Sequence, residues 1–370
     1  MTKRRCRWGI MGTAGIARKN WQAIADSGNG KLVAVASRTQ AKAQQFIDEC
    51  QGQVPHPQVP EAVEGYQALL DRTDIDAVYI PLPTGMRCEW VVKAAAASKH
   101  VLAEKPAANN AAEVKQMIDA CDEHGVQYMD GVMYMHTERL KRMRDVIDDG
   151  HSIGKIKRIS AAFSFCAPDE FVAQNIRANS QLEPLGCLGD LGWYTVRFAL
   201  WVMNWQMPKR VCGQLLDEVQ GPGSPESVPT EFSGELFFEG GVSASFYNAF
   251  TAENQQWAHI SGSRGLLTVN DFVLPYLGNT LRFEVSNAVF DQRGCVFTME
   301  DYTTQHATRE YSNNAPSAQE ANLFRNFAAN VLSGKVDAHW PKITLQTQQI
   351  LDACLASARN GGGVVQLAST

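Results

Sequence analysis

The first third of the chain alternates short apolar runs with segments that have the periodicity of amphipathic helices. Short, wholly apolar runs are typical of strands that are buried on both faces of a sheet. When such strands alternate with helices, the expected arrangement is a parallel sheet covered by helices on both faces. The pattern predicts strands at 7–11, 31–37, 77–80, 100–103 and 127–129, and helices at 16–25, 41–50, 86–97 and 111–123.

The pattern changes after Gly131, where strand-like segments begin to follow one another without a helix between them. Alternating apolar and polar positions are typical of antiparallel strands with one buried face. This part of the chain predicts strands at 156–165, 231–238, 242–248, 257–261, 266–269 and 281–285, and helices at 137–149, 190–203, 318–332 and 344–359. We therefore expect an α/β domain at residues 1–130, followed by an α+β domain with a large, mostly antiparallel sheet at residues 131–370.

The composition narrows the class of protein. The formal net charge of −5 is mild and the basic residues are scattered, which argues against binding to nucleic acid or to a membrane surface. The apolar stretch near the N-terminus is interrupted by three glycines, which argues against a signal peptide or a membrane span. The nine cysteines include no C-x-x-C pair, which favours free thiols in a reducing cytoplasm. The histidines show no metal-ligand spacing, so no metal is expected.

A glycine-bearing segment joins the first predicted strand to the first predicted helix. Small residues at such a turn let the backbone approach a pyrophosphate, which then lies on the free amides of the helix N-terminus. The spacing departs from G-x-G-x-x-G, and the alternative is a strand-to-helix turn that binds nothing. The context favours a dinucleotide-binding Rossmann domain, with candidate contacts at Gly9, Gly12, Thr13, Ala14, Gly15 and Ile16.

The end of the second predicted strand indicates which dinucleotide binds. NAD-selective sites usually have an acidic residue here for the ribose hydroxyls, whereas this chain has Ser37 and Arg38. A hydroxyl and a guanidinium suit a 2′-phosphate through charge-assisted hydrogen bonds and stacking on the adenine. The alternative is that Arg38 is a solvated residue at the start of a helix. The pair favours NADP over NAD.

Four segments together resemble one family of oxidoreductases. They are Glu104-Lys105-Pro106, Ile80-Pro81-Leu82-Pro83-Thr84, Asp190-Leu191-Gly192-Trp193-Tyr194 and Ser37-Arg38. Their order and distances are similar to those of the glucose–fructose oxidoreductase, inositol dehydrogenase and rhizopine catabolism (Gfo/Idh/MocA) family, including its dihydrodiol and xylose dehydrogenase branch and its plant-type members. The resemblance runs through nearly the whole chain. It implies an open-faced sheet in the second domain, which many members use to dimerise, and hence a homodimer or a higher homo-oligomer.

The resemblance also implies that Lys105 is a catalytic lysine, often with a cis bond before Pro106, and that Glu104 supports the cofactor and the lysine. A lysine just past the carboxyl end of a strand lies where doubly wound sheets bind ligands. There it can hydrogen-bond a substrate oxygen and contact the cofactor. The alternative for this short motif is a salt-bridged surface turn.

Asp190 and Tyr194 are four residues apart on one predicted helix, so they are expected on the same face. The resemblance implies that both face the nicotinamide cleft, with Tyr194 moving the hydroxyl proton and Asp190 orienting the substrate. A nearby Lys105 ammonium would lower the pKa of Tyr194 and favour its phenolate. The alternative is that Asp190 caps a helix and Tyr194 is a core residue.

The remaining candidates are carried by the resemblance alone. Many family members have Asn where this chain has Thr84, His where it has Arg87, and His where it has Tyr194. These departures change the contacts expected beside the nicotinamide ribose. Arg177 resembles a recurrent family arginine and is structural or substrate-lining. The additional candidate cofactor contacts are Pro81, Leu82, Pro83, Thr84, Arg87, Glu104 and Lys105, and the candidate substrate contacts are Lys105, Arg177, Asp190 and Tyr194.

Together these features predict an NADP-dependent oxidoreductase. It would transfer a hydride between the nicotinamide and a secondary alcohol or hemiacetal carbon of a sugar, polyol or cyclic dihydrodiol. One alternative is a glycosidase of the same fold that keeps its nicotinamide bound and recycles it. The other is a non-catalytic NADP-binding regulatory protein, against which the intact Lys105 and Tyr194 argue.

Overall fold

Six parallel strands form the first of two sheets in the computed structural model, which describes residues 4–168 and 170–367. The strand order is β3-β2-β1-β4-β5-β6, so the order reverses between β1 and β4. This is the doubly wound Rossmann topology, in which ligands bind at the carboxyl ends of the strands beside the reversal. The strands are β1 (Cys6–Met11), β2 (Gly30–Ser37), β3 (Glu61–Glu64), β4 (Ala77–Ile80), β5 (His100–Ala103) and β6 (Tyr128–Asp130), and the helices are α1 (Gly15–Asp26), α2 (Gln40–Gln53), α3 (Tyr66–Leu70), α4 (Thr84–Ala96) and α5 (Ala111–Glu123).

Nine strands form the second sheet, in the order β14-β13-β12-β11-β7-β10-β9-β8-β15. Only β7 and β10 pair in parallel among its described strands. The expected α/β domain followed by a mostly antiparallel sheet is therefore confirmed. The strands are β7 (Ile156–Cys166), β8 (Arg210–Val219), β9 (Val228–Phe237), β10 (Ser243–Ala249), β11 (Thr251–Gly262), β12 (Leu266–Val269), β13 (Leu281–Arg293), β14 (Val296–Thr308) and β15 (Val365–Gln366).

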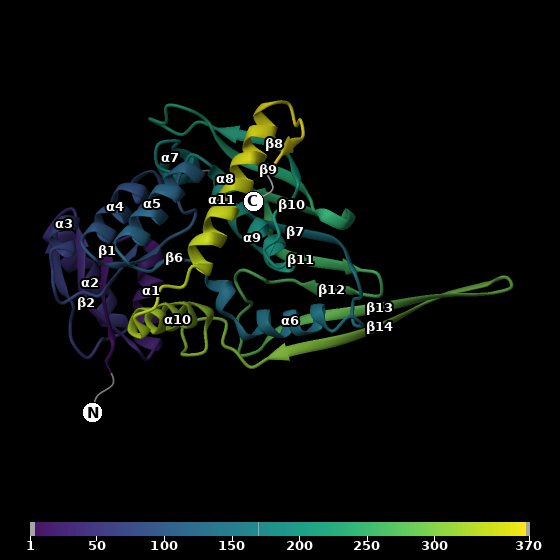
Figure 1. Ribbon diagram of the computed structural model, residues 1–370, viewed down its shortest axis with the longest axis horizontal. Helices are drawn as coiled ribbons and strands as arrows, with labels where there is room; N and C mark the ends of the chain where they lie inside the picture. Colours follow the sequence, from purple (N-terminus) through teal and green to yellow (C-terminus); the bar gives the residue numbers. More distant parts are fainter. Residues whose placement is uncertain (1–3, 169, 368–370) are drawn as a thin grey trace.

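Helices pack against one face of this second sheet (Figure 1). Helix α9 contacts β7 and β10, α8 contacts β9, and α6 contacts β13 and β14. Residues that alternate with the buried ones, such as Ser160, Ser245 and Trp257, are partly exposed on the other face. The helical segments of this part are η1 (Met133–His136), α6 (Glu138–Asp148), α7 (Glu170–Gln174), η2 (Ile176–Ala178), α8 (Gly186–Asp190), α9 (Gly192–Val202), η3 (Glu239–Gly241), α10 (Gln319–Ser333) and α11 (His339–Arg359).

The last two long helices return to the first sheet. Helix α10 packs on α1, β1 and β2, and α11 packs on α5 and β6 (Figure 1). The ring of Trp8 in β1 contacts Phe324 and Phe327 of α10, with centroids 5.0 and 5.2 Å apart. A fully buried ion pair between Asp130 of β6 and Arg197 of α9, with a 2.6 Å contact, also joins the two parts. The two sheets are therefore fixed to each other by core packing.

The helix predicted at 190–203 is wrong as a single element. The chain forms α8, which ends at Asp190, and α9, which begins at Gly192. Leu191 between them has φ −103° and ψ −39°, and although its amide still donates to the Cys187 carbonyl, the Tyr194 amide donates to the carbonyl of Leu191, three residues back, so the hydrogen bonding tightens at this point. Asp190 and Tyr194 therefore belong to different helices. The apolar residues continue through the break, which is why the sequence pattern did not indicate it.

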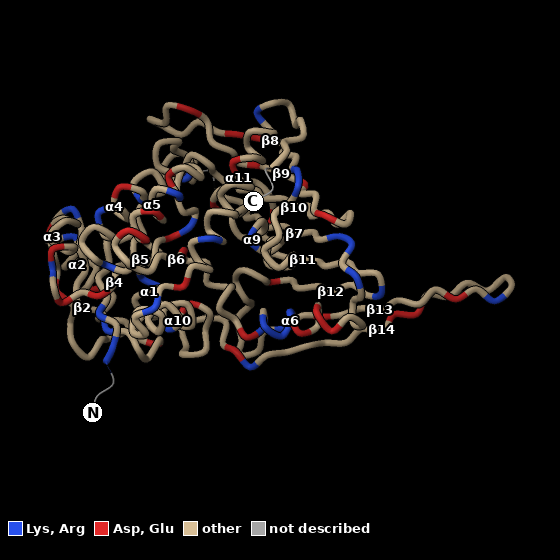
Figure 2. The backbone as a smooth tube through the Cα atoms, in the orientation of Figure 1, with Lys and Arg blue, Asp and Glu red and all other residues tan. Residues whose placement is uncertain are grey.

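The structure also adds elements that the apolar pattern did not predict. Strand β14 carries Thr and acidic residues on both faces and is almost entirely exposed, so it lacks the alternation of a half-buried strand. Strand β13 continues past the predicted 281–285 to pair with it. Charged residues of both signs are interspersed over both sheets and their helices (Figure 2). Among the described residues, no helix is both long enough and apolar enough to cross a membrane.

Candidate active site

A cavity of about 660 Å³ lies at the carboxyl ends of the first sheet's strands and extends to the second sheet. Its lining includes the residues that directly follow β4, β5 and β6, and Ala14 of the turn after β1, which is where a doubly wound sheet binds its ligand. The part from the first sheet and its helices comprises Ala14, Gly15, Ile16, Lys19, Asn20, Pro81, Leu82, Pro83, Arg87, Glu104, Lys105, Pro106, Gly131 and Met133. The remainder comprises Phe163, Ser164, Phe165, Ile176, Arg177, Glu183, Asp190, Leu191, Tyr194, Asn254, Gln255, Gln256, Val273, Leu274, Tyr276, Glu320 and Leu323.

The turn between β1 and α1 has the features of an anion-binding helix start. Helix α1 has no side-chain cap at Ala14 and no acidic residue in its first turn, so its first amides face the cavity without a competing carboxylate. Gly12 has φ +115°, which only glycine adopts readily, and a Cβ there would lie 3.1 Å from Leu82. At Gly15 a Cβ would meet nothing within 4 Å, which leaves open space for a ligand.

Six predicted cofactor residues lie outside the cavity lining, namely Gly9, Gly12, Thr13, Ser37, Arg38 and Thr84. Gly9 is inside β1, where a Cβ would approach Ile75 to 3.0 Å, so it serves the packing of the sheet. Ser37 is buried at the end of β2, and its carbonyl accepts the Gly65 amide at 2.8 Å. Arg38 follows it and is exposed, and among the described residues no carboxylate pairs with its guanidinium. The Gly12 amide donates to the Ala36 carbonyl at 2.9 Å, which places the phosphate loop beside this strand end.

Lys105, Asp190 and Arg177 form an ion-paired cluster in the cavity. Lys105 Nζ donates to Asp190 Oδ1 at 2.6 Å and to the Asp190 carbonyl at 2.8 Å. Arg177 Nε donates to Asp190 Oδ2 at 2.7 Å. Burial alone would raise the pKa of Asp190, but the charges and hydrogen bonds of Arg177 and Lys105 hold it well below its usual range. Asp190 is therefore ionised and fixes both cations.

Tyr194 completes this cluster through its ring. Lys105 Nζ lies 4.6 Å from the centroid of the Tyr194 ring, a cation–π contact. The Tyr194 hydroxyl points to Met133 Sδ at 3.7 Å. Burial, followed by the charges of Glu104 and Asp190, raises the pKa of Tyr194 well above its usual value. The expectation that Lys105 lowers this pKa is therefore wrong, because the ammonium lies over the ring and its charge is balanced by Asp190.

Glu104 is held by a network that the sequence analysis missed. Tyr79 of β4 donates its hydroxyl to Glu104 Oε1 at 2.6 Å, and Asn20 of α1 donates to the Tyr79 hydroxyl at 2.6 Å. A Cβ at Gly131 would lie 3.2 Å from Glu104 Oε1, so the next strand end also needs a small residue. The peptide bond between Lys105 and Pro106 is cis, as the family resemblance implied. Glu104 thus ties β4, β5 and α1 together beneath Lys105.

Thr84 and Arg87, two of the three departures from the family pattern, are held by contacts within the protein. Thr84 is fully buried, and its amide and hydroxyl donate to Glu183 at 3.1 and 2.5 Å. Arg87 is also buried, and it donates to the carbonyls of Leu82 and Pro106. Arg87 therefore positions the two backbone segments that line the cavity on either side of Lys105. Glu183 lies far from Thr84 in the chain, so the sequence alone did not indicate this pairing.

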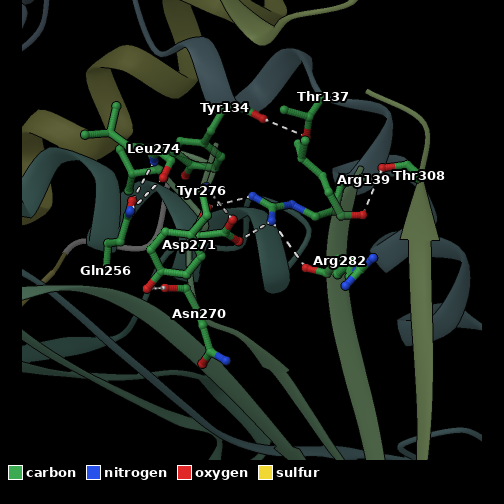
Figure 3. Close-up of polar contacts among 12 residues, drawn as sticks. Tyr134, Thr137, Arg139, Gln256, Asn270, Asp271, Leu274, Tyr276, Arg282 and Thr308 are labelled. Atoms are coloured by element: carbon green, nitrogen blue, oxygen red, sulfur yellow. Dashed lines mark hydrogen bonds and ion pairs between the residues drawn. The ribbon is translucent and has the colours of Figure 1, made fainter. Parts of the chain in front are cut away.

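The wall on the side of the second sheet is a loop anchored by polar contacts (Figure 3). The Gln256 amide pairs with the Leu274 backbone, donating to its carbonyl and accepting from its amide, both at 2.6 Å. Arg139 forms an ion pair with Asp271 and donates to the Asp271 carbonyl at 2.8 Å. Asp271 in turn accepts the Tyr276 amide at 2.8 Å. These contacts hold Leu274 and Tyr276 at the cavity as a preformed apolar wall.

The doubly wound sheet, the open first turn of α1 and the ion-paired lysine beside a tyrosine are the features of a dinucleotide-dependent oxidoreductase. Comparison with known protein families supports the same class of enzyme. Residues 6–132 match the model of the oxidoreductase family with an NAD-binding Rossmann fold, and residues 140–268 match the Gfo/Idh/MocA C-terminal domain. The chain belongs to the Gfo/Idh/MocA family and is an NAD(P)-dependent oxidoreductase.

Three relatives show how far the similarity extends. A dTDP-3,4-didehydro-2,6-dideoxy-alpha-D-glucose 3-reductase from Saccharopolyspora spinosa is 34% identical over 73% of this chain and 76% of its own length. D-xylose 1-dehydrogenase (NADP(+)) 2 from Haloferax volcanii is 32% identical over 71% of this chain and 75% of its own. The crystal structure of a 3-ketoreductase from Actinomadura kijaniata with NADP and TDP-benzene has a TM-score of 0.78 at 26% identity, covering 96% of this chain and 98% of that one.

Proposed function

We propose that this oxidoreductase transfers a hydride between NADP and a secondary alcohol or hemiacetal carbon of a sugar, polyol or dihydrodiol. The observation that carries the proposal is the cluster of Lys105, Asp190 and Tyr194 in one cavity with the open first turn of α1. The enzyme acts on CH–OH groups and its cofactor is NADP, as the names of the xylose dehydrogenase and the bound ligands of the 3-ketoreductase support.

The two parts of the chain would divide the task. Residues 1–130 would bind the dinucleotide, with Gly12, Thr13 and the first amides of α1 on the pyrophosphate and Arg38 on the 2′-phosphate. Residues 131–370 would bind the substrate. The segment 81–83 and Glu104 would line the nicotinamide end of the site, since they follow β4 and β5 at the carboxyl edge.

The side chains of the cluster have separate roles in this proposal. The nicotinamide supplies the hydride chemistry when it is bound. Lys105, held by Asp190, donates a hydrogen bond to the reacting oxygen of the substrate and stabilises negative charge on it. Tyr194 is protonated at neutral pH, so its hydroxyl is suited to donate a proton to that oxygen in the direction of carbonyl reduction. Arg177 and Asp190 orient neighbouring substrate hydroxyls.

A substrate screen tests the proposal. Purified protein is incubated with NADP⁺ and a panel of aldoses, polyols and dihydrodiols, and with NADPH and keto sugars, and the nicotinamide absorbance is followed. We expect net cofactor turnover with at least one compound of these classes. Glycoside cleavage without net turnover would instead identify the recycling glycosidase, and cofactor binding without any reaction would identify the regulatory protein.

Arg38→Ala is expected to lower NADP affinity about tenfold or more and to leave NAD affinity unchanged. The exposed guanidinium at the end of β2 is free to form a charge-assisted contact with a 2′-phosphate, and such contacts contribute about 1.5–3 kcal/mol. Calorimetric titration of both cofactors into wild type and variant measures the difference. Equal affinity of the wild type for NADP and NAD would contradict the assignment.

We also propose that the protein is in the cytoplasm, where its unpaired cysteines stay reduced. There, two copies would pair through the open face of the second sheet. The partly exposed Trp257 and Leu266 on that face support an interface. The end of the β13–β14 hairpin projects from the rest of the protein (Figure 1). It also supports an interface, because Phe290, Phe297 and Met299 are exposed there. Light scattering at micromolar concentration is expected to give the mass of a dimer or higher oligomer, and a strictly monomeric mass would exclude it. Cell fractionation checks the compartment.

A further inference from the structure

Glu320 is a buried carboxylate at the cavity that the sequence analysis did not single out. It is the second residue of α10, is 5% exposed and belongs to the cavity lining. Its Oε1 pairs with Lys19 Nζ at 2.5 Å and accepts from Gln319 Nε2 at 3.2 Å. Its Oε2 is buried and has no hydrogen-bond partner among the described residues. Among the described residues it is one of nine such buried side-chain atoms, and the one that belongs to a residue of the cavity lining, so it points to a donor on a bound molecule.

A purely structural role does not account for this arrangement. A carboxylate in the first turn stabilises a helix through the dipole and by accepting backbone amides. In the described structure no backbone amide donates to the Glu320 carboxylate, and α10 has no side-chain cap. Lys19 instead directs the carboxylate across to α1.

The neighbours of Glu320 place it on the cofactor side of the cavity. Lys19 lies one helical turn beyond Gly15, on the helix whose first amides face the phosphate position. The next residue, Asn20, belongs to the network that holds Glu104 beneath Lys105. After burial and the charges of Glu104 and Asp190, the Glu320 charge also raises the pKa of Tyr194, so it acts on the reactive end of the cavity.

We propose that Glu320 Oε2 accepts a hydrogen bond from the carboxamide N–H₂ group of the bound nicotinamide. The carboxamide is the N–H donor that the reactive end of this cofactor offers, and a carboxylate acceptor makes the hydrogen bond charge-assisted. A site with such an acceptor rejects an analogue that lacks the donor, because the buried oxygen then stays unpaired. Lys19 is a positioning residue that holds the carboxylate in place.

The test compares NADP⁺ with its 3-acetylpyridine analogue, in which a methyl ketone replaces the carboxamide. Calorimetric titration of wild-type protein is expected to show about tenfold or tighter binding of NADP⁺. Glu320→Ala should bind the two cofactors equally, and Glu320→Gln, which keeps one acceptor oxygen, should show an intermediate preference. No turnover is needed, so the outcome does not depend on whether the proposed substrate class is right.

A matched control is Asp352→Asn on α11. Asp352 is a partly buried carboxylate that accepts the Ala111 amide at 2.7 Å, away from the cavity lining. This variant is expected to lower Tm without changing the cofactor preference. The proposal is overturned if Glu320→Ala keeps the wild-type preference for NADP⁺ over its 3-acetylpyridine analogue and shows only a lower Tm. It is equally overturned if the wild type shows no preference between the two cofactors.

Discussion

Lys105→Met is expected to lower kcat by about a hundredfold or more while NADP affinity stays near that of the wild type. Lys105 Nζ contacts both Asp190 and the ring of Tyr194, so the substitution removes the charge at the centre of the cluster. Methionine keeps much of the side-chain length, and Asp190 retains its 2.7 Å pair with Arg177, so no carboxylate is left without a counter-charge. Turnover of an active sugar and calorimetric titration of NADP separate the effects on chemistry and on binding.

Lys93→Met is the control for the loss of a lysine charge. Lys93 is on the exposed side of α4, where it pairs with Glu89 and lies over Trp90. Exposed pairs of this kind contribute little to stability, so turnover and cofactor binding should both match the wild type. A Lys105→Met enzyme that keeps more than about a tenth of the wild-type kcat would remove Lys105 from the chemistry.

Tyr194→Phe is expected to lower kcat by about a hundredfold or more with little change in Tm. The substitution keeps the ring over Lys105 and removes only a hydroxyl whose one hydrogen-bond contact among the described residues is the weak acceptor Met133 Sδ. Tyr134→Phe is the matched control, because this neighbouring buried phenol donates to the Tyr194 carbonyl at 3.3 Å and is not part of the cavity lining. If both variants lose activity equally, the effect comes from packing and not from proton transfer.

The raised pKa of Tyr194 also predicts how turnover depends on pH. Burial keeps the phenol protonated well above neutral pH, so a proton donor is present throughout the range from about pH 6 to 9. The kcat for carbonyl reduction should therefore stay flat over this range, whereas the kcat for alcohol oxidation, which needs a proton acceptor, should rise with pH.

The double variant Lys105→Met with Tyr194→Phe should lose much less kcat than the product of the two single losses, because either change already disables the pair.

Local sequence signals were sufficient for the first sheet and for the residues at its strand ends. The wholly apolar strands and the helices between them predicted β1, β2, β4 and β5 within a residue or two, because strand burial and helix periodicity are local properties. Lys105 and the turn from Gly12 to Ile16 come just after those strand ends in the sequence, so the prediction of the strands also located these residues. The lysine's partners were also identified, although the helix that was expected to carry Asp190 and Tyr194 is two helices.

The missed residues pair with partners that are distant in the chain. Glu320 contacts Lys19 from near the opposite end of the sequence, and Thr84 contacts Glu183, which lies 99 residues further along the chain. No periodicity or turn signal reports such contacts, since they depend on how α10 and the segment before α8 pack against the first sheet. Strand β14 was missed for another reason, because exposed polar residues on both faces hide the alternation on which strand prediction relies.

The return of α10 to β1 has a consequence for how the protein is made. Trp8, near the N-terminus, is covered by Phe324 and Phe327, which are among the last residues of the core to be synthesised. Until α10 leaves the ribosome, this side of the first sheet exposes apolar surface while the whole second sheet is being translated. Chains that stop short of α10 are therefore expected to need chaperones or to be degraded, even though all six strands of the first sheet are complete.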